Sequence, residues 1–421
     1  MKLLNVDLLE TALDKLEQEM TAAGKNIIET ETLPVHNTLG RVLAEDIFSA
    51  ENIPGFNRST VDGYAVVAAD TAGASESIPA FLEIAGEVEM GKAAPGVITS
   101  GKCMYVPTGG MVPDGADAVA MVEYCQPFGA DQMAVYSPLS YGRNMVFAGD
   151  DVTEGEKLLS RGRRIRPADI GLLCAAGNAL ADVYCPWKVY IISTGDEIVM
   201  PWEKPGPGQV RDVNTYSLIA EAERMGLEVV GWDVVRDNEK LLREKVAGAM
   251  ETADFVCISG GSSQGKKDAT EAIIDDLTSS GAFTHGLAVK PGKPTILGFD
   301  RPSETAVVGL PGHPVAAVLL FREIVGGIWQ RFTGADVSEK KITVSGIMAA
   351  NMAASPGRKT FQLVELDYDH QDDETGLPRI IPVLGKSGLI RTLSRADGYI
   401  VIDVNDEGIN KGEQVKVHLL G

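Results

Sequence analysis

From about residue 188 to residue 330 the sequence alternates apolar strand patterns with helical patterns, and this alternation restricts the fold more than any other feature. Each expected strand is short and apolar, and each segment between strands repeats apolar residues at helical spacing. Such alternation is typical of a mostly parallel, doubly wound sheet with helices on both faces. The expected strands are Val189–Ile192, Leu227–Val235, Phe255–Ile258 and Ala306–Leu310, and the expected helices are one capped by Asn214, Glu239–Met250, Ala269–Leu277 and one carrying Ala317–Ile328.

Short β-like runs, cut by glycine and proline, lie on both sides of this region. They predict an inserted β domain and a C-terminal β-barrel, while a small α-containing N-terminal domain is interrupted by the insert. The fold class is therefore multidomain α/β plus β. The predicted domains are 1–49 with 146–185, 50–145, 186–332 and 333–421, of which the third is the ligand-binding α/β domain.

The chain has 421 residues and a formal net charge of −21, and both numbers limit its function. An acidic chain is poorly suited to bind nucleic acid or an anionic membrane, where lysine and arginine neutralise phosphate. The cysteines form no C-x-x-C pair, the histidines show no metal-ligand spacing, and neither a signal peptide nor a membrane-spanning apolar run is evident. We expect a cytoplasmic protein without nucleic-acid or membrane partners.

Every expected strand of the α/β region is followed by a turn rich in glycine, hydroxyl or acidic residues. The carboxyl ends of parallel strands meet at one edge of a sheet, where ligands of such folds bind. Glycines there let backbone N–H groups approach a phosphate, although a plain strand-to-helix connection is the alternative for any single turn. The residues of these turns that we expect to contact substrate are Ser193, Thr194, Gly195, Gly260, Gly261, Ser262, Gly265, Pro311, Gly312 and Pro314.

The same turns exclude two common nucleotide-binding motifs and carry several acids. The stretch Gly260–Gly265 is neither G-x-G-x-x-G nor a Walker A loop, which argues against a nicotinamide dehydrogenase or a P-loop NTPase. Asp196, Glu197, Asp237 and Asp268 also follow expected strands. Two carboxylates about 4 Å apart repel by roughly 4 kcal/mol at an effective dielectric of 20, so either one is protonated or a cation lies between them. Mg²⁺ held by carboxylates and phosphate oxygens fits, and an N-cap is the alternative for Asp237 and Asp268.

Two lysines three positions apart, Lys290 and Lys293, stand in the segment Val289–Pro294. Its two prolines stiffen the backbone, because the proline ring fixes φ near −65°. Paired cations at a stiff turn of an acidic chain indicate a site for a pyrophosphate or an oxyanion. A tight loop with two solvated lysines is the alternative.

Several segments together resemble the molybdopterin molybdenumtransferase family, which includes the enzymatic C-terminal domain of gephyrin. Ile258–Gly265 followed by Asp268 resembles the family's SGG-x-S-x-G-x-x-D signature, and Pro54–Val66 resembles its S-A-M-D-G-Y-A segment. Thr108–Val119 is similar to its T-G-x-x-x-P-x-G-A-D-A-V stretch. The segments Ser193–Glu197, Lys290–Pro294 and Gly309–Pro314 complete the set. The resemblance covers essentially the whole chain.

The resemblance implies an enzyme of molybdenum cofactor biosynthesis. Such an enzyme inserts molybdenum from molybdate into adenylylated molybdopterin, releases AMP, requires Mg²⁺ and forms an elongated homodimer, whose product goes to acceptor molybdoenzymes. The residues carried over as catalytic are Asp62, Thr108, Glu197, Asp237, Asp268, Lys290 and Lys293, and Asp151 and Ser387 are carried over as substrate contacts. Asp62 and Thr108 belong to the β insert, which in the family faces the α/β domain of the partner subunit.

The implied roles fit the chemistry of the residues. Lys290 and Lys293 would hold the pyrophosphate or the incoming oxyanion, and Glu197 and Asp268 would hold Mg²⁺ or the adenylyl part. Asp62 would orient the hydrolytic water or the metal oxo group. Positioning and charge compensation need no strong nucleophile, and none is evident.

Two departures from the family pattern and two alternative functions stay open. His313 stands where the family has asparagine, and Phe147–Asp150 precedes Asp151 where basic residues are common. The alternatives are a molybdopterin adenylyltransferase, in which the β domains would be unexpected, and a pterin-binding scaffold without turnover. The sequence does not decide between molybdate and tungstate, and it does not give the acceptor enzymes, the domain orientation or the dimer contacts.

Overall fold

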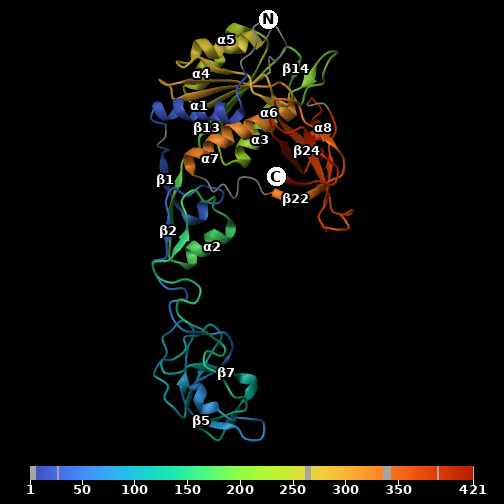
Figure 1. The fold of residues 1–421 in the computed structure, drawn as a ribbon. Helices are drawn as coiled ribbons and strands as arrows, with labels where there is room; N and C mark the ends of the chain where they lie inside the picture. Colours follow the sequence, from blue (N-terminus) through green and yellow to red (C-terminus); the bar gives the residue numbers. More distant parts are fainter. Residues whose placement is uncertain (1–5, 26–27, 261–266, 335–342, 386–387, 421) are drawn as a thin grey trace.

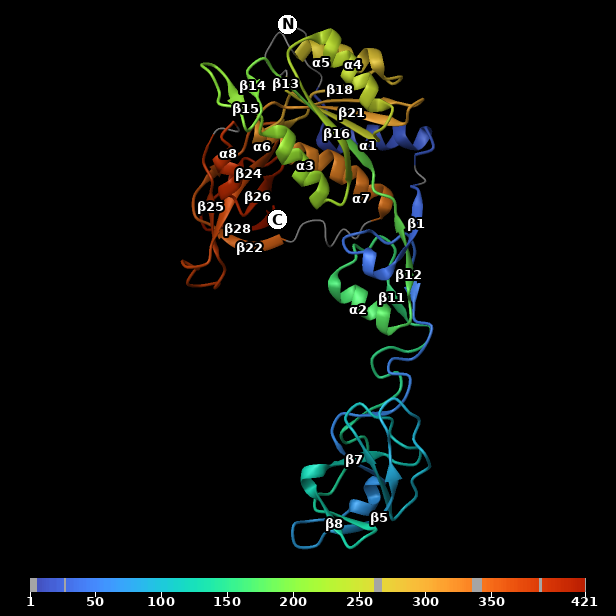
Figure 2. The ribbon, with the colours of Figure 1, turned by 180° about the vertical axis from the view of Figure 1, so that it is seen from behind.

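The computed structural model of the chain describes residues 6–25, 28–260, 267–334, 343–385 and 388–420, without the side chains of Lys267 and Asp268. The molecule is elongated (Figure 1). An α/β unit and a C-terminal barrel lie side by side at one end, the β insert lies at the other end, and a small unit connects them (Figures 1 and 2). Among the described residues, no helix is both long enough and apolar enough to cross a membrane.

The α/β unit is built on a six-stranded sheet in the order β16-β13-β17-β21-β20-β18. Its strands are β13 (Lys188–Thr194), β16 (Glu228–Val235), β17 (Phe255–Gly260), β18 (Ala282–His285), β20 (Ile296–Asp300) and β21 (Thr305–Leu310). The first four strands in the sheet order pair in parallel, whereas β20 runs antiparallel to both β21 and β18. The predicted mostly parallel sheet is confirmed, and the antiparallel pair at its side is an addition that the sequence did not reveal.

Helices cover both faces of this sheet, each burying an apolar stripe. On one face lie α1 (Leu9–Ala22), α3 (Asn214–Arg224), α6 (Pro314–Phe321) and α7 (Gly327–Thr333), and on the other lie α4 (Glu239–Met250) and α5 (Lys267–Leu277). A π-helical segment, η4 (Arg322–Gly326), joins α6 to α7. The last predicted helix is therefore continuous, but its hydrogen bonding changes at Arg322. A parallel pair, β14 (Ile198–Val199) with β15 (Val210–Arg211), projects from the sheet.

In Figure 2, the small connecting unit lies below the α/β unit, and the β insert lies below the connecting unit. The connecting unit contains β1 (Thr30–Pro34), η1 (Val35–Asn37), β2 (Ile47–Phe48), β11 (Lys157–Leu159), α2 (Pro167–Ala175) and β12 (Leu180–Tyr184). The insert contains a sheet in the order β7-β4-β6-β5-β9-β8. Its strands are β4 (Gly63–Val66), β5 (Ala80–Glu87), β6 (Lys102–Val106), β7 (Ala118–Met121), β8 (Cys125–Phe128) and β9 (Gln132–Val135), with η2 (Ala68–Thr71) and η3 (Val122–Tyr124) between them and β3 (Arg58–Ser59) and β10 (Met145–Val146) at the entry.

The C-terminal unit is a closed five-stranded barrel. Its strands are β22 (Thr343–Met348), β24 (Lys359–Asp367), β25 (Arg379–Pro382), β26 (Gly398–Ile402) and β28 (Gln414–Leu419), and the pairing of β24 with β26 closes it. The smaller elements are β23 (Met352–Ala353), α8 (Ile390–Arg395) and β27 (Gly408–Ile409). A short strand of the α/β unit, β19 (Val289–Lys290), pairs in parallel with β24 and so attaches the two units to each other. The predicted barrel is confirmed, whereas this attachment was not foreseen.

Candidate active site

The parallel strands of the central sheet end at one edge, which we call the carboxyl edge. The turns that start after Thr194, Val235, Gly260 and Leu310 all leave from it. The segment Lys290–Pro294 lies there too, because it runs between the end of β18 and the start of β20, where Ile296 pairs with Gly309 near the end of β21. Residues widely separated in the sequence are thus brought to one side of the sheet.

Some predicted site residues lie outside the described residues. They are Gly261, Ser262, Gly265, Ser387 and the side chain of Asp268. Helix α5, in which Asp268 is the second residue, leads to β18, which starts at the opposite edge of the sheet. The first turn of α5 therefore points toward the carboxyl edge.

Asp196 and Asp237 hold two neighbouring turns of the carboxyl edge together. The backbone N–H of Asp196 donates to Asp237 Oδ2 at 3.2 Å, and the backbone N–H of Asp237 donates to Asp196 Oδ1 at 3.1 Å. Thr194 Oγ1 also donates to Asp237 Oδ1, at 3.3 Å. Backbone N–H groups thus solvate the two carboxylates. The predicted cation or proton between such acids stays a prediction.

Glu197 lies directly above Gly195, with its carboxylate exposed. A Cβ placed on Gly195 would lie 2.8 Å from Glu197 Oε2, so any larger residue would displace this carboxylate from its position over the turn. Gly260 is constrained in a similar way, because its φ is +128° and a Cβ there would lie 2.1 Å from the carbonyl oxygen of Thr194. Gly260 thus fixes the local backbone geometry of the edge, and Gly195 sets the position of the Glu197 carboxylate.

Several buried polar side chains contact one another behind the carboxyl edge, and the sequence did not predict these contacts. Ser193 Oγ lies 2.7 Å from Thr215 Oγ1, and Asp212 Oδ1 accepts the Thr215 backbone N–H at 3.1 Å. Ser193 is fully buried, so its side chain holds α3 to β13 and does not line an open surface. Burial, and then the Asp212 charge, raise the pKa of Tyr216 on the same helix. The sequence signal that could have revealed this group is the acid Asp212 beside the amide Asn214 at the start of a helix.

Asn214 does not cap α3 as predicted. It is the first helical residue, and its Nδ2 donates to Ser259 Oγ at 2.8 Å and to the Gly312 carbonyl at 2.9 Å. Asp212 takes the capping role. Asn214 Oδ1 and Asp212 Oδ2 are buried and have no hydrogen-bond partner among the described residues. Buried oxygens of this kind are rare in folded proteins, so they indicate a position where a donor is expected to bind.

The turn before α6 brings the last of the edge residues into place. Pro311 is buried and its carbonyl accepts from Ser259 Oγ at 3.5 Å, while Pro314 occupies the first turn of α6, where its missing N–H has no helical partner to lose. His313, at the N-cap position, makes no capping hydrogen bond with its side chain. Its ring instead lies close to Gly388 of the barrel unit, where an added Cβ would be 3.6 Å from His313 Cδ2.

Lys290 and Lys293 line a cavity of about 530 Å³ between the α/β unit and the barrel, which we call the lysine pocket. Both lysines are exposed, and Arg358 of the barrel adds a third cation to the lining. The α/β wall consists of Val289–Pro294, His313 and Val315, and the barrel wall includes Met352, Arg358, Thr360–Leu363, Val383 and Thr392. Gly292 has φ +114° and packs on Leu320, where a Cβ would lie 2.2 Å from Leu320 Cδ1. The pocket is therefore a cationic cavity with walls from two units.

The remaining predicted residues lie far from the carboxyl edge within one chain. In the β insert, Asp62 Oδ1 accepts the Thr108 backbone N–H at 2.8 Å and its hydroxyl at 3.1 Å. Asp151 lies between the insert and the connecting unit, and its N–H donates to the Ile53 carbonyl at 3.0 Å. The insert and the α/β unit occupy opposite ends of the molecule (Figure 1). Asp62 and Thr108 thus form a pair that cannot meet Lys290 of the same chain in this conformation.

The described residues contain no cluster of three or more histidine, cysteine, aspartate or glutamate side chains that could hold a metal ion. The acidic oxygens nearest to such a role are those of Glu197, Asp196 and Asp237 at the carboxyl edge. A metal held there would need further oxygen donors from a ligand, as Mg²⁺ commonly has.

Three domain families match successive parts of the chain. Residues 8–177 match the MoeA N-terminal region (domain I and II), residues 190–329 match the "Probable molybdopterin binding domain", and residues 345–420 match the MoeA C-terminal region (domain IV). The chain is 30% identical to the molybdopterin molybdenumtransferase of Haemophilus influenzae, over 97% of this chain and 99% of that protein. It is also 30% identical to the molybdopterin molybdenumtransferase of Bacillus subtilis, over 93% of this chain and 90% of that one.

A solved structure is similar over the full length. The molybdopterin biosynthesis moeA protein from Pyrococcus horikoshii superposes with a TM-score of 0.78 at 30% identity, covering 99% of this chain and 100% of that chain. The similarity therefore extends over all units of the fold.

Proposed function

The chain belongs to the MoeA family of molybdenum cofactor biosynthesis, and from this premise we propose that it inserts molybdenum from molybdate into adenylylated molybdopterin with release of AMP. One observation carries the proposal for the site. The lysine pocket opens next to the carboxyl edge of the domain that matches the molybdopterin-binding family, so a cationic oxyanion site adjoins a nucleotide site.

The carboxyl edge is proposed to bind the pterin nucleotide. Its support is the set of constrained turns: Gly195 and Gly260 allow close backbone approach, and the start of α6 presents N–H groups to an anion. The unpartnered oxygens of Asp212 and Asn214 would accept hydrogen bonds from N–H groups of a bound ring. Asp237 would act mainly through its contacts with Asp196 and Thr194, which fix the shape of the edge.

The lysine pocket is proposed to bind molybdate. Lys290, Lys293 and Arg358 supply positive charge without an acidic side chain among the lining residues. Molybdate held there would be close to the dithiolene of a pterin on the edge, and the two reactants would then react as one bound assembly. The pocket chemistry applies equally to tungstate, which has the same charge and nearly the same size.

Completion of the site by a second copy of the chain is also proposed. Asp62 and Thr108 lie at the opposite end of the molecule from Lys290, so in a homodimer of antiparallel, elongated subunits the insert of one copy would reach the carboxyl edge of the other. Asp62 would accept a proton from the water that cleaves the phosphoanhydride. Asp151 and Ser387 stay predictions as substrate contacts.

Mg²⁺ is proposed as a cofactor that would be held by Glu197 and Asp268 together with phosphate oxygens. Glu197 fits this role, since its carboxylate is exposed at the carboxyl edge above Gly195. When bound, the ion would neutralise charge on the phosphates during AMP release. Lys290, Lys293 and Glu197 would orient the substrates around it. The five unpaired cysteines favour the proposed cytoplasmic location, where acceptor molybdoenzymes would receive the product.

One reaction distinguishes this function from the alternatives. Purified protein is mixed with adenylylated molybdopterin, molybdate and Mg²⁺. AMP release together with mature cofactor is expected. Consumption of ATP with free molybdopterin would instead indicate an adenylyltransferase, and tight pterin binding without AMP release would indicate a scaffold.

A further inference from the structure

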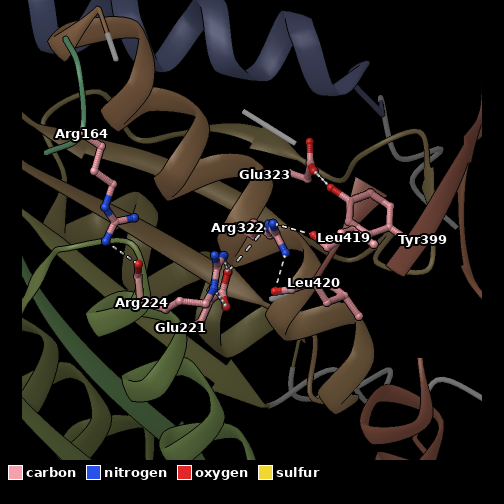
Figure 3. A network of polar contacts seen from close by, with 8 residues as sticks. All are labelled: Arg164, Glu221, Arg224, Arg322, Glu323, Tyr399, Leu419 and Leu420. Carbon is pink, nitrogen blue, oxygen red and sulfur yellow. Dashed lines mark hydrogen bonds and ion pairs between the residues drawn. The ribbon is translucent and has the colours of Figure 1, made fainter. Parts of the chain in front are cut away.

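A network of polar contacts joins the α/β unit to the barrel, and Figure 3 shows its residues. Arg322 donates from Nη1 to the Leu420 carbonyl at 3.1 Å and from Nη2 to the Leu419 carbonyl at 2.9 Å. Tyr399 donates from its hydroxyl to Glu323 Oε1 at 2.6 Å. We call Arg322, Glu323, Tyr399, Leu419 and Leu420 the joint.

The joint is built from strong and buried contacts. The Arg322 side chain is 13% exposed, and its guanidinium lies 6.0 Å from the centre of the Tyr399 ring. Burial, followed by the neighbouring Glu323 carboxylate, raises the pKa of Tyr399, which keeps the phenol protonated as a donor. A guanidinium that binds two carbonyls fixes direction as well as distance, because its N–H groups form a rigid fork. The joint therefore holds the last strand of the barrel in one orientation.

The joint and the lysine pocket share the same structural elements. Helix α6 starts at the pocket, where Val315 is part of the wall, and its eight residues lead directly to Arg322, a rise of about 12 Å. Leu320 of α6 packs against Gly292 between the two lysines. On the barrel side, Tyr399 packs edge-on against Phe361, with ring centres 5.8 Å apart, and Phe361 lines the pocket. Both walls of the pocket are thus continuous with the joint.

Resting on the function proposed above, we infer that Arg322 is a positioning residue for molybdate: by fixing the barrel against α6–η4, it sets the spacing between Lys290 and Lys293 on one wall and Arg358 on the other. The pairing of β19 with β24 extends over two residue pairs only. A buried apolar cluster that includes Val315, Phe361 and Tyr399 also joins the units, but apolar packing is not directional. The joint adds directional polar contacts to this packing. The carboxyl edge lies within the α/β unit, so the pterin nucleotide site does not depend on the joint.

The effect of removing Arg322 can be separated from a general loss of stability. Glu221, which lies 3.9 Å from Arg322 Nε, keeps its bond from Arg224 Nε at 2.9 Å, so R322A leaves no buried carboxylate without a cation. A matched control stands on the same helical rod. Arg331 of α7 donates from Nη1 to Asp14 at 2.8 Å and to Glu17 at 2.6 Å of α1, and it does not contact the barrel unit in any of these bonds.

The experiment measures two dissociation constants on the full-length chain: molybdate by equilibrium dialysis, with tungstate as a second probe, and adenylylated molybdopterin by fluorescence. R322A should raise the Kd for molybdate about tenfold or more, and R322K, which keeps one donor to a carbonyl, should raise it about threefold. R331A should leave it unchanged. All three variants should bind the pterin nucleotide within about twofold of the wild type.

An unchanged Kd for molybdate in folded R322A would overturn this inference and leave the proposed function standing. Equal weakening of molybdate binding and pterin nucleotide binding would also overturn the inference, because it would indicate a general loss of structure. If R322A does not fold, Y399F decides. It removes the hydroxyl that bonds to Glu323, so a weakening of molybdate binding of about threefold is expected, and no change would overturn the inference. Absence of saturable molybdate binding in the wild type would instead refute the proposed function of the pocket, and the inference with it.

Discussion

The carboxyl edge and the lysine pocket adjoin each other but are held in different ways. At the edge, contacts within one unit fix the side chains: the backbone N–H of Asp196 and that of Asp237 each donate to the other's carboxylate, and Gly260 has a positive φ that favours glycine. The pocket has cations from two units, and its shape depends on how the barrel is attached. A site within one unit is robust, whereas a site between two units can be adjusted or lost through distant contacts.

The largest effect is expected from removing both cations of the α/β wall. K290A/K293A should weaken molybdate binding by about 100-fold or more, because each charge-assisted hydrogen bond contributes roughly 1.5–3 kcal/mol. The pterin nucleotide should bind nearly as well as before, and the unfolding temperature should not change, since both side chains are exposed. Equilibrium dialysis and thermal unfolding measure these quantities. K240A, at an 87% exposed lysine of α4, is the control.

Loss of pterin nucleotide binding in K290A/K293A would contradict the division between edge and pocket. It would favour the other role considered for these lysines, which is to hold the pyrophosphate.

A complementation experiment tests whether a second copy completes the site. D62A and K290A/K293A should each be inactive. If one subunit contributes Asp62 and the other contributes the lysines, a re-equilibrated equal mixture should recover about a quarter of the wild-type AMP release, because half of the dimers have one intact site of two. If all these residues act within one chain, the mixture stays inactive.

The edge could be predicted from the sequence much better than the pocket. Helix α4 has the predicted bounds Glu239–Met250 and strand β28 has the predicted bounds Gln414–Leu419, because period and local breakers decide such elements. Parallel pairing then placed the turns at one edge. Strand β19 leaves the central sheet to pair with β24, and no local pattern records a partner 70 positions later.

The roles of individual polar residues were the least predictable. Asn214 has the sequence position of a cap, but its amide reaches Ser259 and Gly312, which are close only in the folded chain. The reciprocal bonds of Asp196 and Asp237 likewise depend on adjacent strands. The sequence identified the residue types at the edge correctly, while their partners are set by tertiary structure.

Two glycine variants test how rigidly the edge is held. G260A should lower the free energy of unfolding by about 2–4 kcal/mol and weaken pterin nucleotide binding, because its Cβ would lie 2.1 Å from the Thr194 carbonyl oxygen. G248A in α4 is the matched control. No atom lies within 4 Å of its added Cβ, so alanine should stabilise the helix by about 0.5–1 kcal/mol. Denaturant unfolding measures both changes, and equal stability of G260A and wild type would show that the edge can relax.

The smallest expected change is in stability, and it comes from an ion pair that attaches the barrel near β19. Lys359 of β24 forms an ion pair with Glu10 of α1 and lies 3.6 Å from Asp403. Partial burial raises the pKa of Glu10, but the hydrogen bond from Lys359, a backbone hydrogen bond and the charges of Lys359 and Arg331 together lower it below its usual value of 4.5. A carboxyl whose pKa is lowered by folding stabilises the fold above its unfolded pKa, and this contribution is lost as the pH falls through the folded value.

E10Q should therefore be less stable than the wild type by under about 1 kcal/mol at pH 7, since the Glu10 side chain is 55% exposed and solvent screens the pair. The difference should shrink below about pH 4.5 and vanish when Glu10 is protonated in the folded protein. Denaturant unfolding from pH 7 to pH 3 measures it, and a difference that persists at pH 3 would assign the effect to packing. Because this pair is weak, its loss should disturb the lysine pocket less than the loss of the two carbonyl bonds of Arg322.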